Sequence, residues 1–560
     1  MSKLLSGSHL LMKILAFYGF FMVFLNPFFQ TENWFQSSST FLIVPSAVVY
    51  FVYIFFSFFA SLTYLGFLKD CFFDLILYLP LMILTYGTVH PAQVILLREA
   101  TVFFRSYIEK NTLAHLANAM TERPSRLIAL GFLGVILLGT LLLLLPVSMT
   151  SSSKPSFITA LFTSTSAVCV TGLNVIDPGT YYTFFGQLVI VALIQVGGIG
   201  IMALSAGVMI ILGRKFAIGQ KSLFQNALDV SDAESMFESL RAIFFWTFAI
   251  ELTGATILAY RFFVLLNCGL ARAVYLGFFH SVSAFCNAGF ALFPDNLMSF
   301  AKDPVVNLTI MSLIICGGLG FTVIPVFPAL LRGKRKAAPD IHFNLVVITT
   351  ICLILVGGLG IFILEINGTA MSGLSLSEKL MASFFKSVTA RTAGFNTIDA
   401  GLMKPASLFL IIILMFIGAS PGSTGGGIKT TTFAAMVLTF IAQLKSENEV
   451  HVFGRSLSRD TVLKAFLITG ISGCLVAGFT LCLLVIEDKP MISILFEVVS
   501  AFATVGLSTG ITSSLQPASQ LFLILLMYIG RIGPLTWALS FINTSQQGEV
   551  CYPAGRILIG

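Results

Sequence analysis

The stretch FHSVSAFCNAGF, residues 279–290, decides the fold because three other stretches of the chain can be laid over it. In each stretch a Phe lies ten residues before a Gly, and Leu or Phe follows that Gly. The other three are FTSTSAVCVTGL (162–173), FFKSVTARTAGF (384–395) and FEVVSAFATVGL (496–507). The FFKSVTARTAGF stretch fits best when one residue is skipped before its Gly. A pattern that recurs four times at spacings of 105 to 117 residues indicates an internal repeat, whose glycines are Gly172, Gly289, Gly394 and Gly506.

Long apolar runs precede and follow every one of these stretches. A helix needs about 20 residues to cross the hydrocarbon of a bilayer, and all eight runs are long enough. Those before the stretches are residues 127–145, 242–266, 345–364 and 465–486, and those after them are 184–212, 305–331, 408–441 and 521–541. The short apolar segments between them, such as 156–168 and 491–503, have only about a dozen residues, which fits a helix that enters the membrane partway. The repeating unit is therefore helix, pore loop, helix.

The composition agrees with a membrane protein. Of 560 residues, 57% are hydrophobic and 10% are charged, which excludes a cytosolic enzyme, a nucleic-acid binder and a secreted disulfide scaffold. The net charge of +7 is explained by basic loops between the repeats, which place those loops in the cytoplasm. We expect a multi-pass protein of the cell (inner) membrane that is surrounded by lipid and binds no nucleic acid.

These observations predict an all-α integral membrane fold, in which four tandem repeats of helix, pore loop and helix surround a central pore. The predicted regions are an accessory transmembrane part (1–124), four pore repeats (125–240, 241–342, 343–460 and 461–545) and a cytoplasmic tail (546–560). The accessory part adds three or four transmembrane helices, the fourth at 91–108. Arg98 and Arg105 share a face of that segment, which faintly resembles part of a voltage sensor, and an amphipathic cytoplasmic helix is the alternative.

The residues after each short segment are predicted to bind the ion. Non-helical backbone at membrane depth must be buried in protein or line a water-filled path, and carbonyls exposed around Gly can replace the hydration shell of a cation. The predicted ion-binding residues are Val170, Thr171, Gly172, Leu173, Asn287, Ala288, Gly289, Phe290, Thr392, Ala393, Gly394, Phe395, Thr504, Val505, Gly506 and Leu507. Three acids follow these segments and would concentrate cations at the outer mouth, unless they are ordinary loop acids: Asp177, Asp295 and Asp399.

Two further features interrupt the helices that follow the pore loops. A Gly-rich stretch from Gly418 to Thr430, with Pro421, cannot continue a helix in the middle of the membrane. Arg531 lies inside the last long apolar run and must face the bundle interior or a cavity, where a salt bridge or backbone carbonyls would satisfy it. The glycine pairs at 197–198 and 317–318 are predicted to allow close helix packing.

On the four glycines, the Gly-rich stretch and the sequence Tyr528 to Pro534, residues 125–545 resemble the superfamily of Ktr, Trk and HKT potassium transporters, and most of all its Ktr-type membrane subunit. The resemblance implies potassium uptake and a homodimer bound to a cytosolic nucleotide-binding regulatory subunit of the RCK type. A Gly at all four filter positions goes with potassium preference in that superfamily. The resemblance also implies that the Gly-rich loop is a gate, formed by Gly418, Ser420, Pro421, Gly422, Ser423, Thr424, Gly425, Gly426, Gly427 and Lys429 together with Arg531.

The expected cargo is K⁺, with Na⁺ as a candidate activator, and no prosthetic group is expected. Lys386 and Arg391 add positive charge beside the third pore loop, where an acid or a phosphate could pair with each. An enzyme is not expected, because the spans lack clusters of titratable residues. Two alternatives stay open at this point: an ion-coupled secondary transporter of a small solute, and a sodium-conducting member of the same superfamily.

Overall fold

The computed structural model describes residues 124–150, 156–200, 233–326, 340–447 and 449–541, which fall into two compact units. In the smaller unit, the described residues belong to Leu141–Phe157 and Thr180–Val189. There Met149 and Tyr182 form an antiparallel bridge, and the Thr150 amide donates to the carbonyl of Tyr181 at 3.1 Å. The larger unit consists of Arg123–Thr140, Ile158–Gly179 and Ile190–Gly560, and it contains every ion-binding and gate residue predicted above.

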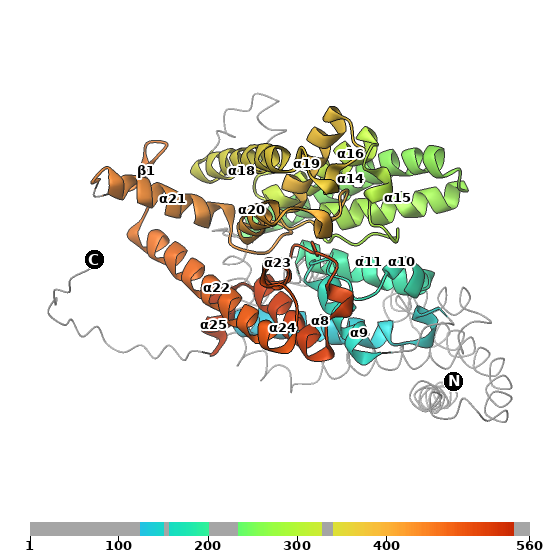
Figure 1. Ribbon diagram of the computed structural model, residues 1–560. Coiled ribbons are helices and arrows are strands. Elements are labelled where there is room, and N and C mark those ends of the chain that lie inside the picture. The colour runs from blue at the N-terminus through green and yellow to red at the C-terminus, as the bar shows by residue number, and fades with distance from the viewer. Residues whose placement is uncertain (1–123, 151–155, 201–232, 327–339, 448, 542–560) are drawn as a thin grey trace, which may run out of the picture. The chain divides into compact units, whose positions relative to one another are not determined.

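Four long helices match the four apolar runs predicted to precede the pore loops. They are α8 (Pro124–Leu143), α14 (Ala233–Leu266), α18 (Ile341–Glu365) and α22 (Arg459–Ile486) (Figure 1). Capping side chains fix two of the starts, since Asp340 accepts the Phe343 amide at 2.8 Å and Ser458 accepts the Thr461 amide at 3.3 Å. In the described ranges, three helical stretches are long and apolar enough to cross a membrane: Arg241–Leu266, Ile341–Glu365 and Arg459–Ile486.

These long helices carry large apolar side chains on their outer surface. Ile363 of α18 is 70% exposed and Val485 of α22 is 88% exposed. A soluble protein rarely leaves contiguous surfaces of this kind open to water, whereas hydrocarbon tails solvate them well. The helices therefore face lipid, in agreement with the predicted all-α membrane fold.

A shorter helix follows each long one and is largely buried. These helices are α9 (Phe157–Val168), α15 (Leu270–Phe285), α19 (Leu376–Thr389) and α23 (Met491–Phe502). The bounds of α9 and α23 confirm the segments predicted at 156–168 and 491–503. A capping box starts α19, because Ser375 and Glu378 each accept a backbone amide from the other. In Figure 1, α14 and α15 run side by side, and they pack against each other.

Helices also follow the four pore loops, and two of them are interrupted where the sequence predicts a continuous helix. They are α11 (Phe184–Ile199), α16 (Pro304–Leu319), α20 (Pro405–Phe416) with α21 (Thr430–Leu444), and α24 (Pro517–Ile532) with α25 (Pro534–Phe541). The prediction that 305–331 and 521–541 are single helices is wrong. Gly320 and Gly533 both adopt a φ of 97°, which interrupts the helical hydrogen bonds, although the flanking residues stay apolar. Gly200 has a φ of 88° at the end of α11, so three of these helices end in the same way.

The turn between α21 and α22 contains a hairpin that the helix-only prediction missed. Strand β1 (His451–Val452) pairs antiparallel with β2 (Arg455–Ser456), with His451 opposite Ser456. Phe453 and Gly454 connect the strands with φ angles of 50° and 77°, the sign pattern of a type I′ turn. Short helical turns occur in other connections: η2 (Pro146–Ser148), α10 (Pro178–Tyr181), η3 (Met298–Phe300), η5 (Thr369–Met371), η6 (Ala400–Leu402) and η7 (Thr512–Ser514).

Several predictions concern residues outside the described ranges. They include the three or four accessory helices in 1–124 with the sensor-like segment at 91–108, and the tail at 546–560. The basic loop residues at 214–221 and 332–336 also lie outside the described residues. These remain predictions from sequence.

Candidate functional site

The four segments that follow the short helices share one unusual backbone conformation. Each contains two residues with positive φ, separated by one other residue. The second of each pair is the repeat glycine, with φ of 92°, 68°, 78° and 91° at Gly172, Gly289, Gly394 and Gly506. The first is a residue with a side chain, for which positive φ is uncommon: Val170, Asn287, Thr392 and Thr504, at 56°, 58°, 70° and 51°. Strain repeated at four matching places indicates a functional constraint.

The four glycines lie against one another in a closed ring. A Cβ added to Gly172 would lie 2.4 Å from the carbonyl oxygen of Ala288, and one added to Gly289 would lie 2.7 Å from that of Ala393. The ring continues in the same sense, with 2.5 Å from Gly394 to the carbonyl of Val505 and 2.1 Å from Gly506 to that of Thr171. The carbonyl before each glycine therefore packs against the glycine of another segment. The structure brings together the predicted ion-binding residues of all four repeats.

A hydroxyl from each short helix supports its own segment. Ser166 accepts the Gly172 amide at 3.0 Å, and Ser500 accepts the Gly506 amide at 3.1 Å. In the other two repeats the hydroxyl donates to the carbonyl after the glycine, from Ser283 to Phe290 at 2.7 Å and from Thr389 to Phe395 at 2.8 Å. These four residues were not among the predicted site residues. A Ser or Thr at the same place in all four stretches was the available signal.

Two hydroxyls of the segments themselves have no partner in the described part of the chain. Thr171 Oγ1 and Thr504 Oγ1 are both buried, and neither makes a hydrogen bond to the described protein. Buried polar atoms nearly always find a partner, so such atoms mark a place for water or an ion. Hydroxyl and carbonyl oxygens are neutral ligands, the kind used for potassium rather than for a tightly held divalent ion.

The three acids that the sequence predicts at the outer mouth each hold the loop that follows their segment. Asp177 accepts the Gly179 amide at 3.0 Å, and Asp399 accepts the Gly401 amide at 2.8 Å. Asp295 accepts the Ser299 amide at 2.7 Å. Asp399 is exposed and the other two are partly exposed, so each carboxylate combines a turn-capping bond with contact to solvent.

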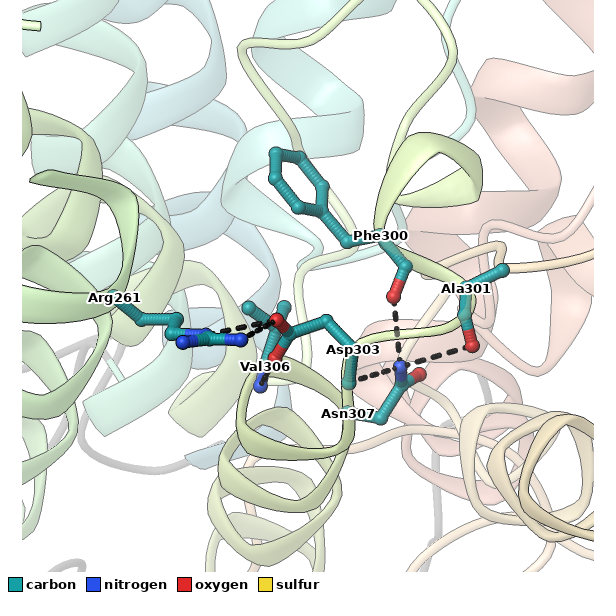
Figure 2. Close-up of polar contacts among 6 residues, drawn as sticks. All are labelled: Arg261, Phe300, Ala301, Asp303, Val306 and Asn307. Carbon is teal, nitrogen blue, oxygen red and sulfur yellow. Dashed lines mark hydrogen bonds and ion pairs between the residues drawn. The ribbon is translucent and has the colours of Figure 1, made fainter. Parts of the chain in front are cut away.

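Asp303, directly before α16, makes both an ion pair and a helix-capping hydrogen bond (Figure 2). It caps α16 by accepting the Val306 amide at 2.9 Å, and it pairs with Arg261 of α14 at 2.6 Å. Burial opposes ionisation, but the bonds from Arg261 and Val306 hold the pKa of the Asp303 carboxyl below its usual value. Asn307 donates to the carbonyls of Phe300 and Asp303 at 2.9 and 2.6 Å.

The Gly-rich loop begins where α20 ends, and the chain forms no helix from there until Thr430. Ile417 and Ile428 form a parallel bridge that closes the loop at its base. Its Ser420 and Thr424 amides donate to the carbonyls of Gly318 and Gly317, at 3.1 and 3.3 Å, at the C-terminal end of α16. The loop is therefore held by the preceding repeat.

This loop lies directly against two ring segments. A Cβ on Gly425 would lie 2.0 Å from the Thr392 hydroxyl, and one on Gly426 would lie 2.4 Å from the Thr504 hydroxyl. Lys429 donates to the carbonyl of Gly425 at 2.7 Å, so it holds the loop and has a protein partner. No side chain larger than hydrogen fits at these two positions without a shift.

Arg531 connects the loop to two other repeats. Its guanidinium donates to the carbonyl oxygens of Thr424 and Gly197, from the loop and from α11. Carbonyl ligands thus satisfy the intramembrane charge, one of the two possibilities left open by the sequence. The glycine pairs do pack closely, as predicted, since a Cβ would lie 2.0 Å from Val168 O at Gly197 and 1.9 Å from Phe285 O at Gly317.

A buried polar group that was not predicted lies next to the second segment. The Glu251 carboxylate of α14 accepts from the Gln195 amide nitrogen of α11 at 3.0 and 3.1 Å, and it also accepts from the Cys286 thiol at 3.8 Å. Near the third segment, Lys386 donates to Asn396 at 2.7 Å and Arg391 to the Thr350 hydroxyl at 3.3 Å. Both hydrogen bonds go to neutral groups, and the carboxylate of Asp399 also interacts electrostatically with Lys386.

Comparison with known proteins places these features in context. The family model described as TrkH, cation transport protein, matches residues 127–551. Ktr system potassium uptake protein B is 41% identical in Bacillus subtilis and 39% in Vibrio alginolyticus, over 78% of this chain and 97% and 94% of those proteins. The potassium/sodium uptake protein NtpJ of Enterococcus hirae is 36% identical, over 78% of this chain and 97% of that protein. The crystal structure of the potassium transporter TrkH from Vibrio parahaemolyticus has a similar fold, with a TM-score of 0.60 at 20% identity over 89% of this chain and 98% of that one.

Proposed function

The chain belongs to the TrkH family of cation transport proteins, and on this premise we propose that it takes up potassium ions across the cell membrane through the ring of four segments. The relatives at 41% and 39% identity are potassium uptake proteins by name, and the similarity extends over nearly their whole length. The cation is the transported substrate. Its direction of net movement follows its electrochemical gradient.

One observation carries the proposal, the closed ring in which each repeat glycine meets the carbonyl of another segment. A dehydrated potassium ion needs several neutral oxygens on all sides, and one chain with four matching segments can supply them. We assign the selectivity filter to the four segments at 170–173, 287–290, 392–395 and 504–507 and treat the repeats as quasi-equivalent. The unpartnered hydroxyls of Thr171 and Thr504 support a path for ions along these segments.

The Gly-rich loop is the proposed gate. It packs against the Thr392 and Thr504 side chains, so an ion leaving the ring on that side must pass it. The contacts of Arg531 with Thr424 and Gly197 favour a closed loop, and the guanidinium adds a positive charge that opposes cation flow. Opening requires these hydrogen bonds to break or exchange.

The outer acids and the assembly complete the proposal. Asp177, Asp295 and Asp399 would raise the local cation concentration at the mouth, while their backbone bonds keep the loops in place. From the resemblance noted above, the working unit is a homodimer regulated by a cytosolic nucleotide-binding subunit of the RCK type. Sodium is a candidate activator for the same reason.

Ion flux into liposomes that contain the purified chain tests this function. We expect potassium and rubidium uptake to exceed sodium uptake clearly in the wild type. Gly172→Ser and Gly394→Ser should lose this discrimination, because a side chain at φ of 92° or 78° is strained and its Cβ would meet a carbonyl 2.4 or 2.5 Å away. Flux of an organic solute with ions, or variants that behave as wild type, would contradict the proposal.

A sodium-conducting transporter is the second candidate, and one comparison favours it. The Enterococcus hirae relative is named a potassium/sodium uptake protein. The same liposomes decide between the two, because equal uptake of sodium and rubidium by the wild type would identify a pore that carries both ions.

A further inference from the structure

One side chain occupies the same register in each short helix. The hydroxyls that support the segments belong to Ser166, Ser283, Thr389 and Ser500. The residues three positions earlier in the chain are Thr163, His280, Lys386 and Glu497. All four are buried, with at most 1% of their surface exposed. Lys and Glu are almost never buried to this extent without a specific partner. This register therefore carries more than packing.

Glu497 is bound to the chain that leaves the ring in the fourth repeat. Its carboxylate accepts the Ser508 hydroxyl at 2.5 Å and the Thr509 amide at 3.2 Å through one oxygen. The other oxygen accepts the Thr512 hydroxyl at 2.9 Å. Ser508 lies two residues after Gly506, so the carboxylate fixes the segment that directly follows the filter glycine. We call the non-helical segment after each filter glycine the exit strand, although it forms no β-sheet in the described part of the chain.

Lys386 does the same in the third repeat with the opposite charge. Its ammonium donates to Asn396 Oδ1 at 2.7 Å, and Asn396 lies two residues after Gly394. The Asn396 backbone is bound in turn to the second repeat, since its amide donates to Asn296 Oδ1 at 3.1 Å and its carbonyl accepts the Leu297 amide at 3.0 Å. Lys386 thus holds a joint between two exit strands.

His280 completes the set in the second repeat. One ring nitrogen lies 2.7 Å from the Leu276 carbonyl and the other accepts the Leu292 amide at 3.3 Å, three residues after Gly289. The ring also stacks on Phe293 with centroids 4.8 Å apart. Thr163 differs, because the bond that its hydroxyl makes goes to Thr159 O of its own helix, at 2.9 Å.

Burying an acid or an ammonium costs free energy that an apolar side chain of similar size would not. Three different polar groups nevertheless bind the equivalent segment in three repeats, the exit strand just beyond the filter glycine. From this coincidence we propose that Glu497, Lys386 and His280 are positioning residues that brace the exit strands and thereby set how well the filter distinguishes potassium from sodium.

This inference rests on the proposed function, because it assumes that the ring is the filter. The ring glycines lie in contact through their backbones, so a strand that relaxes beyond one glycine shifts the carbonyl packed against it. A ring with relaxed carbonyls can contract around the smaller sodium ion. Loss of a brace should then lower the ratio of rubidium to sodium flux, whereas a lower folded fraction reduces both fluxes by the same factor.

The test measures rubidium and sodium uptake in liposomes with full-length variants at matched amounts of folded protein. Glu497→Met and Lys386→Met should each lower the flux ratio by about fivefold, the factor expected for the loss of one net hydrogen bond. Glu497→Gln should restore most of the ratio, because its amide can still accept from Ser508 or Thr509 and donate to Thr512. The matched control is Thr163→Val at the same register, which should keep the wild-type ratio.

Changing the residues that donate to Glu497 provides a second test if Glu497→Met does not fold. Ser508→Ala with Thr512→Val removes two donors but leaves Glu497, and it should lower the ratio in the same direction. The bracing role would be overturned if Lys386→Met kept the wild-type ratio and if Glu497→Met, or Ser508→Ala with Thr512→Val, kept it as well. This conclusion requires that Gly172→Ser still abolishes discrimination. If the wild type itself shows no selective cation flux, the proposed function fails first and this inference fails with it.

Discussion

At the scale of a single residue, two constraints act on Gly506 and can be separated. Its φ of 91° strains any residue with a side chain, by about 1–2 kcal/mol, and its Cβ would lie 2.1 Å from Thr171 O. Gly510 has the same φ of 91°, but no atom lies within 4 Å of an added Cβ. We predict that Gly506→Ala abolishes the preference for rubidium over sodium, whereas Gly510→Ala lowers thermal stability and keeps the preference.

The comparison of these two alanines isolates the ring contact. Both variants share the backbone strain, so a change confined to Gly506→Ala must arise from the displaced Thr171 carbonyl. Flux ratios in liposomes and melting temperatures in detergent provide the two measurements. Equal loss of selectivity in both variants would mean that backbone strain alone, and not the closed ring, controls discrimination.

Asp303 gives a prediction about pH. Its pKa is lower in the folded protein than the ordinary 3.8, so the ionised carboxylate stabilises the fold above that value and loses this contribution as the pH falls through the folded-state pKa. Asp303→Asn keeps a side chain that can cap α16 but removes the ion pair with Arg261. We expect the variant to melt below the wild type at pH 7, with the gap closing below about pH 3.8.

Arg261, the ion-pair partner of Asp303, provides the control. Arg261→Gln should show a similar gap at pH 7, and adding Asp303→Asn to it should cost little more, because each change already removes the same interaction. A gap that stays constant down to the lowest pH at which the wild type is folded would show that the carboxylate charge has no part in the stability.

At the scale of the elements, the sequence predicted the four short helices and the glycines that follow them. Their pattern is local, since a dozen apolar residues before a Gly are visible in a single stretch. The early ends of α16 and α24 were missed, because residues 320 and 533 sit between apolar flanks and hydropathy does not register a positive φ. Lys386 and Glu497 were missed as braces for a different reason. Their partners are set by how the exit strands fold back, which no stretch of sequence contains.

The Gly-rich loop and α24 are linked by hydrogen bonds whose contribution can be measured. Arg531→Gln removes the guanidinium that donates to Thr424 and Gly197, so the loop loses its link to α24 and a positive charge leaves the path. We predict faster rubidium flux with an unchanged ratio to sodium, because the ring itself is untouched. Tyr528→Phe is the control on the same helix, since it removes a 2.7 Å bond to Ala129 O and no loop contact.

The rates distinguish a gate from a structural link. Slower flux in Arg531→Gln, or a rise of the same size in Tyr528→Phe, would indicate that Arg531 only holds α24 in place. Stopped-flow or tracer uptake at matched protein density suffices for the measurement. A changed ion ratio in Arg531→Gln would mean that the loop also shapes the ring, through its contacts with Thr392 and Thr504.

At the scale of the whole molecule, the chain has a core shared with its family and a part that the family model does not match. The match covers 127–551, and 78% of this chain accounts for 97% of the Bacillus subtilis relative. That relative is named for potassium uptake without a counterpart to most of the residues before the core. The ring, the loop and Arg531 all lie inside the shared part. Transport should therefore not require the first 123 residues.

We predict that a chain beginning at Pro124 keeps the wild-type preference for rubidium over sodium in liposomes. If residues 91–108 cross the membrane and carry Arg98 and Arg105 through the field, the full chain should respond weakly to voltage and the shortened chain not at all. Two charges supply at most about 4.6 kcal/mol per 100 mV, from about 2.3 kcal/mol for each, so the response would be shallow. Flux measured at imposed membrane potentials tests both statements. A shortened chain that elutes as a folded species but conducts nothing would make the amino-terminal residues part of the transport path.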